Sequence, residues 1–511
     1  MFADSVIGKL VHWFIGLFAS YKYSVCYRAV SSVCTKIRRL YNYSFLGKIL
    51  SEKNPKRDRY FQNSFLFRTV DKLIDSLNGL FSRIYKFIRQ KNTDGLNVRL
   101  YNLFAPAIKF EYLLAGVLAI MFCIPHDYWN NAYGLILAFG FVFLYMCAKA
   151  SGREFSIKIR DFDVTLVLFI VMVFCGVLTS TSVSDSVRVL LFFVTSFAFM
   201  FCVAGSLNTQ ESIMSFLKIM YVAVFVTSLV AIWQRIVGVP VDPSLTDISM
   251  NQDMPGRVFS TMANPNNYAE FLILFVPLMF VMAVNLKNKM LKTGLITLLI
   301  FPVLAFLMTY SRSGWVSFAL VVFIAIFLYN KKYIPALILL AIAAVPFLPS
   351  SILNRILTIG NMSDSSNSYR IYIWKAVLKM MRERWFFGVG LGPESFHSFY
   401  ARFANPKAAI AMHSHMLYLE TWVETGLVGV VSFLWFYLSM ARRCVVAKRQ
   451  ATPEMKNILI ACAATALGML FICGVEYVWY YPRIMFAFWI FAGICIASCR
   501  VAQNQTDNSI K

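Results

Sequence analysis

"DVTLVLFIVMVFCGVLTS", residues 163–180, is an apolar run close to the length of a bilayer crossing. Inside lipid such a run must form a helix, because its backbone polar groups have to be satisfied within the segment. Comparable runs recur along the 511-residue chain, in which 59% of the residues are apolar and 14% are charged. Ordinary soluble domains have about a quarter charged residues, so this composition predicts an all-α polytopic membrane protein.

About twelve candidate transmembrane helices follow residue 109. Their approximate bounds are 110–125, 131–148, 163–180, 187–206, 214–236, 267–286, 294–309, 314–330, 333–349, 415–440, 457–475 and 483–500. The predicted domains are nine spans within 109–349, a large loop at 350–414, three spans within 415–500 and a tail at 501–511. The loop contains helical periodicity at residues 368–385, and a loop of this length is more often functional than idle.

Residues 1–108 form a basic extension before the first span. Apolar residues recur there at helical spacing, with Lys and Arg among them: Leu66, Val70, Leu73, Ile74, Leu77, Phe81, Ile84 and Ile88. A basic amphipathic helix of this kind can lie in the plane of an anionic leaflet. It can equally pack on another protein or on the membrane domain, and both interpretations stay open.

The formal net charge of +24 is concentrated in particular loops of the chain. Basic loops alternate with loops that have almost no Lys or Arg, and the basic residues are Lys149, Arg153, Lys158, Arg160, Lys287, Lys289, Lys292, Lys331, Lys332, Arg442, Arg443, Lys448 and Arg449. Because cytoplasmic loops carry the excess of Lys and Arg, the pattern indicates membrane topology rather than nucleic-acid binding. It predicts cytoplasmic termini and places the loops 237–266, 350–414 and 476–482 outside, with the turn around Arg312.

Two arginines in these outward-facing segments are candidates for binding an anion. Arg257 is followed by Asn264, Pro265 and Asn266 just before an apolar helix, and Asn-Pro-Asn is a turn and N-cap signal. Arg312 lies in a very short connection between two apolar runs. A guanidinium fork suits phosphate oxygens, and a helix N-terminus adds backbone donors. The alternative is that Arg257 reaches lipid headgroups and that Arg312 only caps a turn.

His413 and His415 stand at the mouth of the tenth predicted span. A histidine there is suited to general-base chemistry, since its ordinary pKa is about 6.5, whereas a solvated or helix-capping histidine is the alternative. No Cys lies nearby and no His-Glu-x-x-His motif is present, so no metal site is predicted. The eleven cysteines are interpreted as small core residues. Weaker candidates for substrate contact are Asn264, Asn266, Arg370, Glu424, Glu476 and Arg483.

Several of these motifs occur in an order that resembles the O-antigen ligase/polymerase superfamily of bacterial envelope proteins. The set comprises Arg257 with Asn264-Pro265-Asn266, "SRSGW" with Arg312, Tyr369-Arg370 with Trp374, "GVGLG" at 388–392, and His415 ahead of "YLETWVETGLVG" at 418–429. The resemblance covers roughly residues 110–500. It implies a multi-pass glycosyltransferase of the GT-C type in the bacterial cytoplasmic membrane. Such a protein moves a glycan from an undecaprenyl-diphosphate carrier to a glycan, lipid or protein hydroxyl on the outer face, with no cofactor.

The resemblance also implies a role for individual residues. Arg257 and Arg312 match the arginines that bind the carrier's diphosphate. His415 matches the histidine that activates the acceptor hydroxyl, because the Gly-x-x-Gly at 426–429 lies at the family spacing from it. His413 is the second candidate for this base.

One departure from the family pattern concerns the type of transferase. The family often has Asn, Ser or Gln directly after the histidine, and this chain has Met416, which weakens a ligase assignment relative to a polymerase. A protein O-oligosaccharyltransferase of the same superfamily is an alternative. A transporter or flippase of lipid-linked saccharide is another, although it would favour inverted repeats and charges near mid-membrane.

Overall fold

The computed structural model describes residues 110–151, 163–242, 254–361 and 365–510, together with scattered positions between residues 32 and 83. Within those ranges every regular element is a helix. The chain divides into two compact units, one of Met1–Ser76 with Ile326–Pro346 and the other of Leu77–Ala325 with Phe347–Lys511. All the candidate site residues belong to the second unit.

In the first unit, α16 (Ile334–Ala344) follows the short 3-10 helix η4 (Lys331–Tyr333), and neither contains a buried residue. The apolar face predicted between residues 66 and 88 lies outside the described residues, as does the basic loop at 152–162. The interpretations of the basic extension therefore stay predictions.

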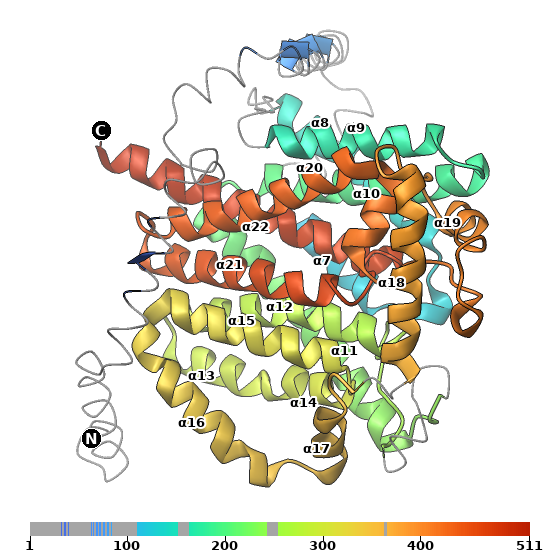
Figure 1. Ribbon diagram of the computed structural model, residues 1–511. Helices are drawn as coiled ribbons and strands as arrows, with labels where there is room; N and C mark the ends of the chain where they lie inside the picture. The colour runs from blue at the N-terminus through green and yellow to red at the C-terminus, as the bar shows by residue number, and fades with distance from the viewer. Residues whose placement is uncertain are drawn as a thin grey trace. The chain divides into compact units, whose positions relative to one another are not determined.

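The second unit contains the helices of the membrane domain. They are α7 (Phe110–Cys123), α8 (Asn131–Ser151), α9 (Val164–Leu178), α10 (Val183–Ser206), α11 (Gln210–Val237), α12 (Pro265–Val284), α13 (Lys289–Leu298), α14 (Ile300–Met308), α20 (Leu417–Ala447), α21 (Pro453–Cys473) and α22 (Pro482–Ile510), and α15 (Arg312–Asn330) begins in this unit (Figure 1). The predicted run 294–309 lies within one candidate span, Lys289–Met308, in which α13 is followed by α14 with only Leu299 between them.

Eight helical stretches among the described residues are long and apolar enough to cross a membrane. Three shorter apolar helices, Phe110–Cys123, Asn131–Tyr145 and Val164–Leu178, accompany them. These findings confirm the prediction of an all-helical polytopic membrane protein.

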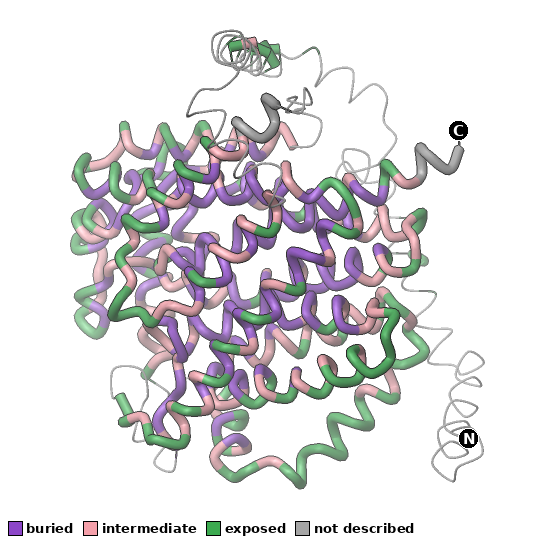
Figure 2. The backbone as a smooth tube through the Cα atoms, turned by 180° about the vertical axis from the view of Figure 1, so that it is seen from behind, coloured by how far each residue is buried: buried purple, intermediate pink, exposed green. Residues whose placement is uncertain are grey.

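Helix α22 forms the centre of the second unit. In the apolar stretch of α22, 94% of the residues are buried. In the candidate span that contains α13 and α14, the corresponding share is 22%. It packs along α10, and α20 packs along α9. Aromatic rings fill the interior, where Trp489 stacks on Phe169 and on Phe436 at interplanar angles of 15° and 16°. Large rings bury much apolar area each, so this layer fixes the inner helices. Figure 2 shows that the backbone of the inner helices is mostly buried.

The described residues of the 350–414 segment form three α-helices, α17 (Ser350–Leu357), α18 (Ser365–Arg384) and α19 (Pro393–Tyr400), and the short 3-10 helix η6 (Pro406–Ala408). Helix α18 runs across the ends of the long helices and contacts α20 (Figure 1). Its buried residues Ile373, Val377 and Met380 pack with Phe396 and Tyr400 of α19. The segment therefore has a core of its own, which holds the polar residues of α18 in fixed positions.

Candidate functional site

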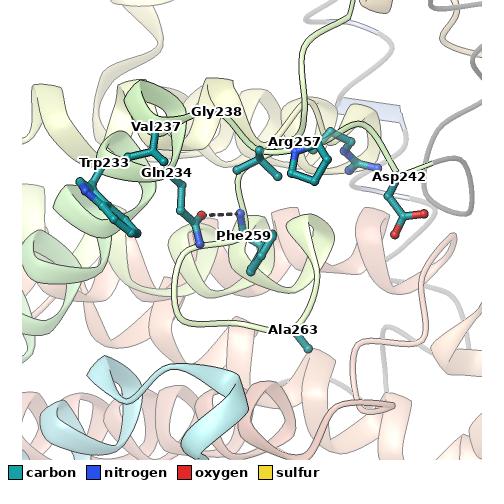
Figure 3. A pocket seen from close by; sticks show the side chains of 10 residues that line it. Trp233, Gln234, Val237, Gly238, Asp242, Arg257, Phe259 and Ala263 are labelled. Carbon is teal, nitrogen blue, oxygen red and sulfur yellow. Dashed lines mark hydrogen bonds between the residues drawn. The ribbon is translucent and has the colours of Figure 1, made fainter.

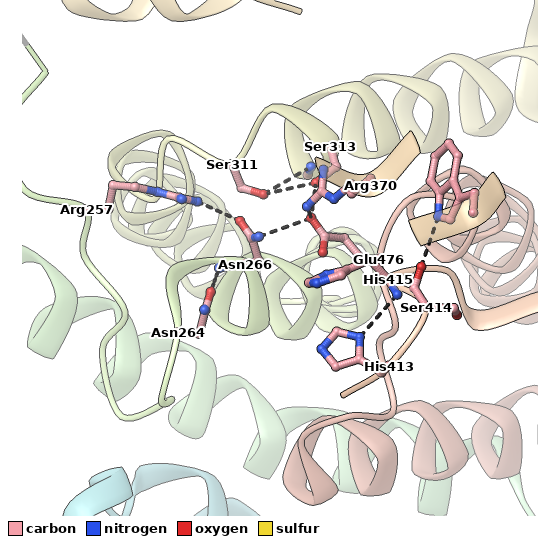
Figure 4. Close-up of polar contacts among 12 residues, drawn as sticks. Arg257, Asn264, Asn266, Ser311, Ser313, Arg370, His413, Ser414, His415 and Glu476 are labelled. Carbon is pink, nitrogen blue, oxygen red and sulfur yellow. Dashed lines mark hydrogen bonds and ion pairs between the residues drawn. The ribbon is translucent and has the colours of Figure 1, made fainter. Parts of the chain in front are cut away.

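Glu476 lies at the centre of a polar network, in the turn between α21 and α22. Its Oε1 accepts hydrogen bonds from Arg370 Nη2 at 2.6 Å, Asn266 Nδ2 at 3.1 Å and Ser313 Oγ at 3.3 Å (Figure 4). The three donors belong to α18, α12 and α15, so one carboxylate joins elements that are distant in sequence. The side chains of the ion pair are 19% and 10% exposed, and charge-assisted hydrogen bonds are about twice as strong as neutral ones.

Arg257 joins this network through Asn266. Its Nη2 donates to Asn266 Oδ1 at 2.6 Å, and its Nε donates to the carbonyl of Thr309 at 2.8 Å. Burial, followed by the charge of Arg355, lowers the pKa of this guanidinium to about 9, while the Glu476 carboxylate opposes the shift. Arg257 is therefore still protonated at neutral pH, in a site crowded with positive charge.

The loop that carries Arg257 is fixed by close backbone contacts. The Gln234 side chain accepts from the backbone N–H of Ser260 at 2.8 Å and donates to the Ser260 carbonyl at 3.0 Å. A Cβ at position 256 would lie 1.8 Å from the carbonyl oxygen of Val239, so this approach requires Gly256. These contacts determine where the arginine that follows the glycine can point.

The start of α12 confirms the predicted Asn-Pro-Asn cap. The side chain of Asn264 accepts a hydrogen bond from the backbone N–H of Asn266 at 2.8 Å, and Pro265 occupies the first helical position. Asn266 thereby faces two partners, since its Oδ1 binds Arg257 and its Nδ2 binds Glu476. The helix N-terminus and the arginine lie together, as the anion-site hypothesis requires.

Arg312 begins α15 and reaches the end of α17. Its Nη1 donates to the carbonyl of Thr358 at 3.0 Å and to the Thr358 hydroxyl at 3.2 Å. Arg355, one turn earlier in α17, is 4% exposed, and its Nε donates to the carbonyl of Tyr310 at 3.3 Å. Sequence reasoning missed Arg355, although a single arginine in the apolar stretch "SILNRIL", residues 351–357, was an available signal.

A groove of about 490 Å³ opens beside Arg257 (Figure 3). It is lined by Trp233, Gln234, Val237, Gly238, Val239, Pro240, Asp242, Arg257, Phe259 and Ala263. Trp233 and Val237, at the end of the candidate span α11, are 61% and 65% exposed. The groove thus offers an apolar surface next to one guanidinium, which suits an amphiphile with an anionic head.

His413 and His415 lie in the loop before α20, and backbone contacts hold this loop in place. Trp374 Nε1 donates to the carbonyl of Ser414 at 2.9 Å, and the backbone N–H of Ser414 donates to Glu420 Oε2 at 2.6 Å. The backbone of His415 has a φ of 52°, a conformation that non-glycine residues rarely adopt. Such strain persists only where the surroundings determine it, and it is common at functional sites.

The two imidazoles contact each other and neighbouring aromatic rings. The backbone N–H of His415 donates to His413 Nδ1 at 3.2 Å, so the neutral His413 ring carries its proton on Nε2. The ring centroids of the histidines are 4.1 Å apart, and that of His413 is 4.2 Å from that of Tyr480. Figure 4 shows both imidazoles on the same side of Glu476 and Arg370.

Both histidines are neutral at physiological pH. Burial, then the charge of Arg370, lowers the pKa of His413 to about 3. Burial, then His413 and Arg370, lowers the pKa of His415 to about 2. A neutral imidazole can accept a proton, and an anionic ligand beside Arg370 would offset part of the repulsion that disfavours the imidazolium.

Glu424 and Arg483, two weaker candidates, bind parts of the protein outside the Glu476 network. Glu424 accepts from the Tyr477 hydroxyl at 3.3 Å and from the backbone N–H of Gly392 at 3.3 Å. Arg483 donates to the carbonyl of Ile124 at 2.6 Å and to that of Thr261 at 2.7 Å. Both side chains tie loops to the ends of the helices.

The glycine motifs shape the same end of the helices. Gly388, Gly390 and Gly392 have φ values of 74°, 102° and 96°, and α19 begins directly after them. Gly426 has a φ of 71° and interrupts the helical backbone of α20. A Cβ there would lie 2.0 Å from the carbonyl oxygen of Phe386, so the kink and the glycine turn fit only without side chains.

Within the described ranges, no group of three or more His, Cys, Asp or Glu side chains is arranged to hold a metal ion. The fold and the site define a polytopic helical membrane protein with arginines, a carboxylate and two histidines gathered at one end of its helices.

Comparison of the sequence with models of known protein families finds a match. Residues 295–434 match the family model described as O-antigen ligase. The match confirms the resemblance over this segment of the membrane protein. It includes Arg312, Arg370 and both histidines, while Arg257 and Glu476 lie outside it. A search of curated proteins found no match.

Proposed function

We propose that the protein is a glycosyltransferase of the O-antigen ligase or surface-polysaccharide polymerase type. It moves a glycan from an undecaprenyl-diphosphate carrier to an acceptor hydroxyl on the outer face of the bacterial cytoplasmic membrane. In this proposal about twelve transmembrane helices form a GT-C-like fold with cytoplasmic termini, and residues 350–414 form the large outer loop. The family match and the polar network that joins Arg257 to Arg370, whose charge acts on both histidines, support this assignment.

The donor lies with its diphosphate against Arg257 and Arg312. The single observation that carries the proposal is the hydrogen-bonded path from Arg257 through Asn266 and Glu476 to Arg370, whose charge reaches both histidines. This path connects the proposed anion site to the two candidate bases. The apolar groove at Trp233 and Val237 lies beside Arg257 and suits the first isoprene units of the carrier.

The proposed step is a single displacement at the anomeric carbon. The acceptor oxygen forms a bond to this carbon while the bond from the carbon to the diphosphate oxygen breaks. The electron pair of the broken bond stays on the prenyl diphosphate, and the acceptor proton passes to His415, with His413 as the alternative base. The arginines stabilise the charge that develops on the leaving group. Because the prenyl diphosphate is already an activated leaving group, the proposed step uses no further cofactor.

Deleting the gene in its host and separating the surface polysaccharide on a gel tests this function. If the protein is a polymerase, the ladder is lost and a band of a single repeat remains. If it is a ligase, lipid-linked polymer accumulates. If it modifies a protein, the polysaccharide is unchanged and one or more glycoproteins lose mass. An unchanged polysaccharide together with unchanged glycoproteins contradicts the proposal.

A further inference from the structure

Arg355 is a buried cation that the proposed step has not used. Helix α17 docks by a hydrogen bond of 3.1 Å between Ser351 Oγ and the Tyr310 hydroxyl, and Ile352 packs with Met254 and Tyr310. Residues three and four positions apart share a helix face, so Arg355 extends from the docked face. Its Nε binds the Tyr310 carbonyl, which places its charge inside the site rather than at the protein surface.

The guanidiniums of Arg355 and Arg312 both lie near enough to Arg257 for their charges to act on it. Among the neighbouring charges, that of Arg355 has the largest effect on Arg257 and lowers its pKa. The hydroxyl of Thr358 donates to the backbone carbonyl of Arg355 at 2.8 Å and accepts from Arg312 Nη1 at 3.2 Å, so Arg312 is anchored at the end of the helix that carries Arg355. Three cations from three elements therefore gather in a sheltered site, at a cost in mutual repulsion.

A ligand with several negative charges offsets this repulsion. We propose that Arg355 is a third guanidinium ligand of the donor's diphosphate, an inference that rests on the proposed function. In the intact donor each phosphate carries one negative charge. When the glycosidic bond breaks, its electron pair stays on the diphosphate and adds one more, while the acceptor proton goes to the base. The positive charge of three guanidiniums therefore complements the leaving group better than it complements the intact donor.

The inference predicts which ligand and which rate depend most on Arg355. Removal of its charge should weaken binding of the departed prenyl diphosphate and slow turnover, with a smaller effect on the KM for the intact donor. Removal of the Arg355 charge should also weaken binding of a prenyl diphosphate more than binding of a prenyl monophosphate, because the monophosphate has one phosphate fewer for Arg355 to contact.

Binding of undecaprenyl diphosphate and undecaprenyl phosphate to the full chain in lipid nanodiscs tests the proposal. Arg355→Gln should weaken diphosphate binding at least about tenfold and monophosphate binding less, since a hydrogen bond to a charged group is lost. Arg355→Lys should recover part of the affinity, because it restores charge without the fork. Arg382→Gln, an exposed position on α18, is the matched control and should bind like the wild type.

The outcomes separate this inference from the proposed function. If the wild-type protein does not bind undecaprenyl diphosphate, both fail. If Arg312→Ala loses binding while Arg355→Gln keeps wild-type affinity, only the role of Arg355 is overturned. If the thermal transition of Arg355→Gln shows that this variant does not fold, Arg355→Lys provides the test. The inference is overturned if Arg355→Lys keeps the wild-type affinity and the wild-type preference for diphosphate over monophosphate. A reduced preference for diphosphate supports the inference.

Discussion

Nη2 of Arg370 lies 2.6 Å from Oε1 of Glu476, and this ion pair joins helix α18 of the 350–414 segment to the turn between α21 and α22. The same oxygen accepts from Asn266, which in turn binds Arg257. Glu476 therefore fixes the position of the candidate diphosphate site relative to the histidine loop.

Loss of this ion pair should impair glycan transfer. Glu476→Gln should lower the transfer rate at least about tenfold, because a neutral amide forms weaker hydrogen bonds with the guanidinium than a carboxylate does. Arg370→Gln should have a similar effect. The double variant should lose little more than the worse single variant, because both changes remove the same interaction.

Rates measured with the reconstituted protein give this double-mutant cycle. Arg188→Gln is the control, because Arg188 pairs with Asp185 through a side chain that is 62% exposed. Fully additive losses in the double variant would show that Arg370 and Glu476 act independently.

Acid should destabilise the protein through the histidine loop. Burial lowers the pKa of His413 from 6.5 to about 3, so between these values the unfolded chain binds a proton that the folded protein does not. The stabilisation is complete above pH 6.5 and is lost as the pH falls toward 3, by about 1.4 kcal/mol per pH unit for each such group. His413→Asn should flatten the decrease in thermal unfolding temperature between pH 7.5 and about 5.

The control for this pH dependence is His126→Asn, which changes an exposed histidine in the connection between α7 and α8. It should leave the slope of stability against pH as in the wild type. A slope that His413→Asn does not change would mean that His413 is not the group that resists protonation.

The fork of Arg257 should matter as well as its charge. Its Nε and Nη2 donate to two different oxygens, those of Thr309 and Asn266, and a lysine ammonium cannot reproduce this geometry. Arg257→Lys should therefore retain less than about a tenth of the wild-type transfer rate. Arg402→Lys, at an exposed position, should retain full activity. Near-wild-type rates in Arg257→Lys would show that the positive charge at this position is sufficient and that the fork is not required.

The kink in α20 should require its glycine. Gly426→Ala would combine a φ of 71° with a Cβ only 2.0 Å from a carbonyl oxygen, and should lower the free energy of unfolding by at least about 2 kcal/mol. Gly116→Ala is the matched control, since nothing lies within 4 Å of its Cβ, and it should be neutral or stabilising by up to about 1 kcal/mol. Thermal unfolding of the purified variants measures both, and equal transitions would refute the structural role of the kink.

The fold class was predictable because each span carries its own signal. Apolar runs such as residues 163–180 must be helical in lipid whatever their neighbours are, and the cap at Asn264 is a local pattern. The local irregularity at Leu299 was not predictable, because the run is apolar on both sides of it.

The candidate site was predictable residue by residue but not as a network. Arg257, Arg312 and the histidines stand out as polar residues at span ends, whereas the pairing of Arg370 with Glu476 joins positions 106 residues apart. No local pattern encodes such a contact. Arg355 had a local signal, as the single arginine of an apolar stretch, but its burial depends on how α17 docks on Tyr310. Arg483 donates to two backbone carbonyls, and its predicted contact with substrate stays a prediction.

The most direct measurement follows the release of undecaprenyl diphosphate from lipid-linked glycan by the purified protein in nanodiscs. The glycan substrate is extracted from host cells that lack the gene. Wild-type protein should release the carrier and extend or label an acceptor, while Arg257→Ala, Arg312→Ala and His415→Ala should each lose at least about a hundredfold in rate with normal yield and folding. Wild-type rates in all three variants would contradict the account.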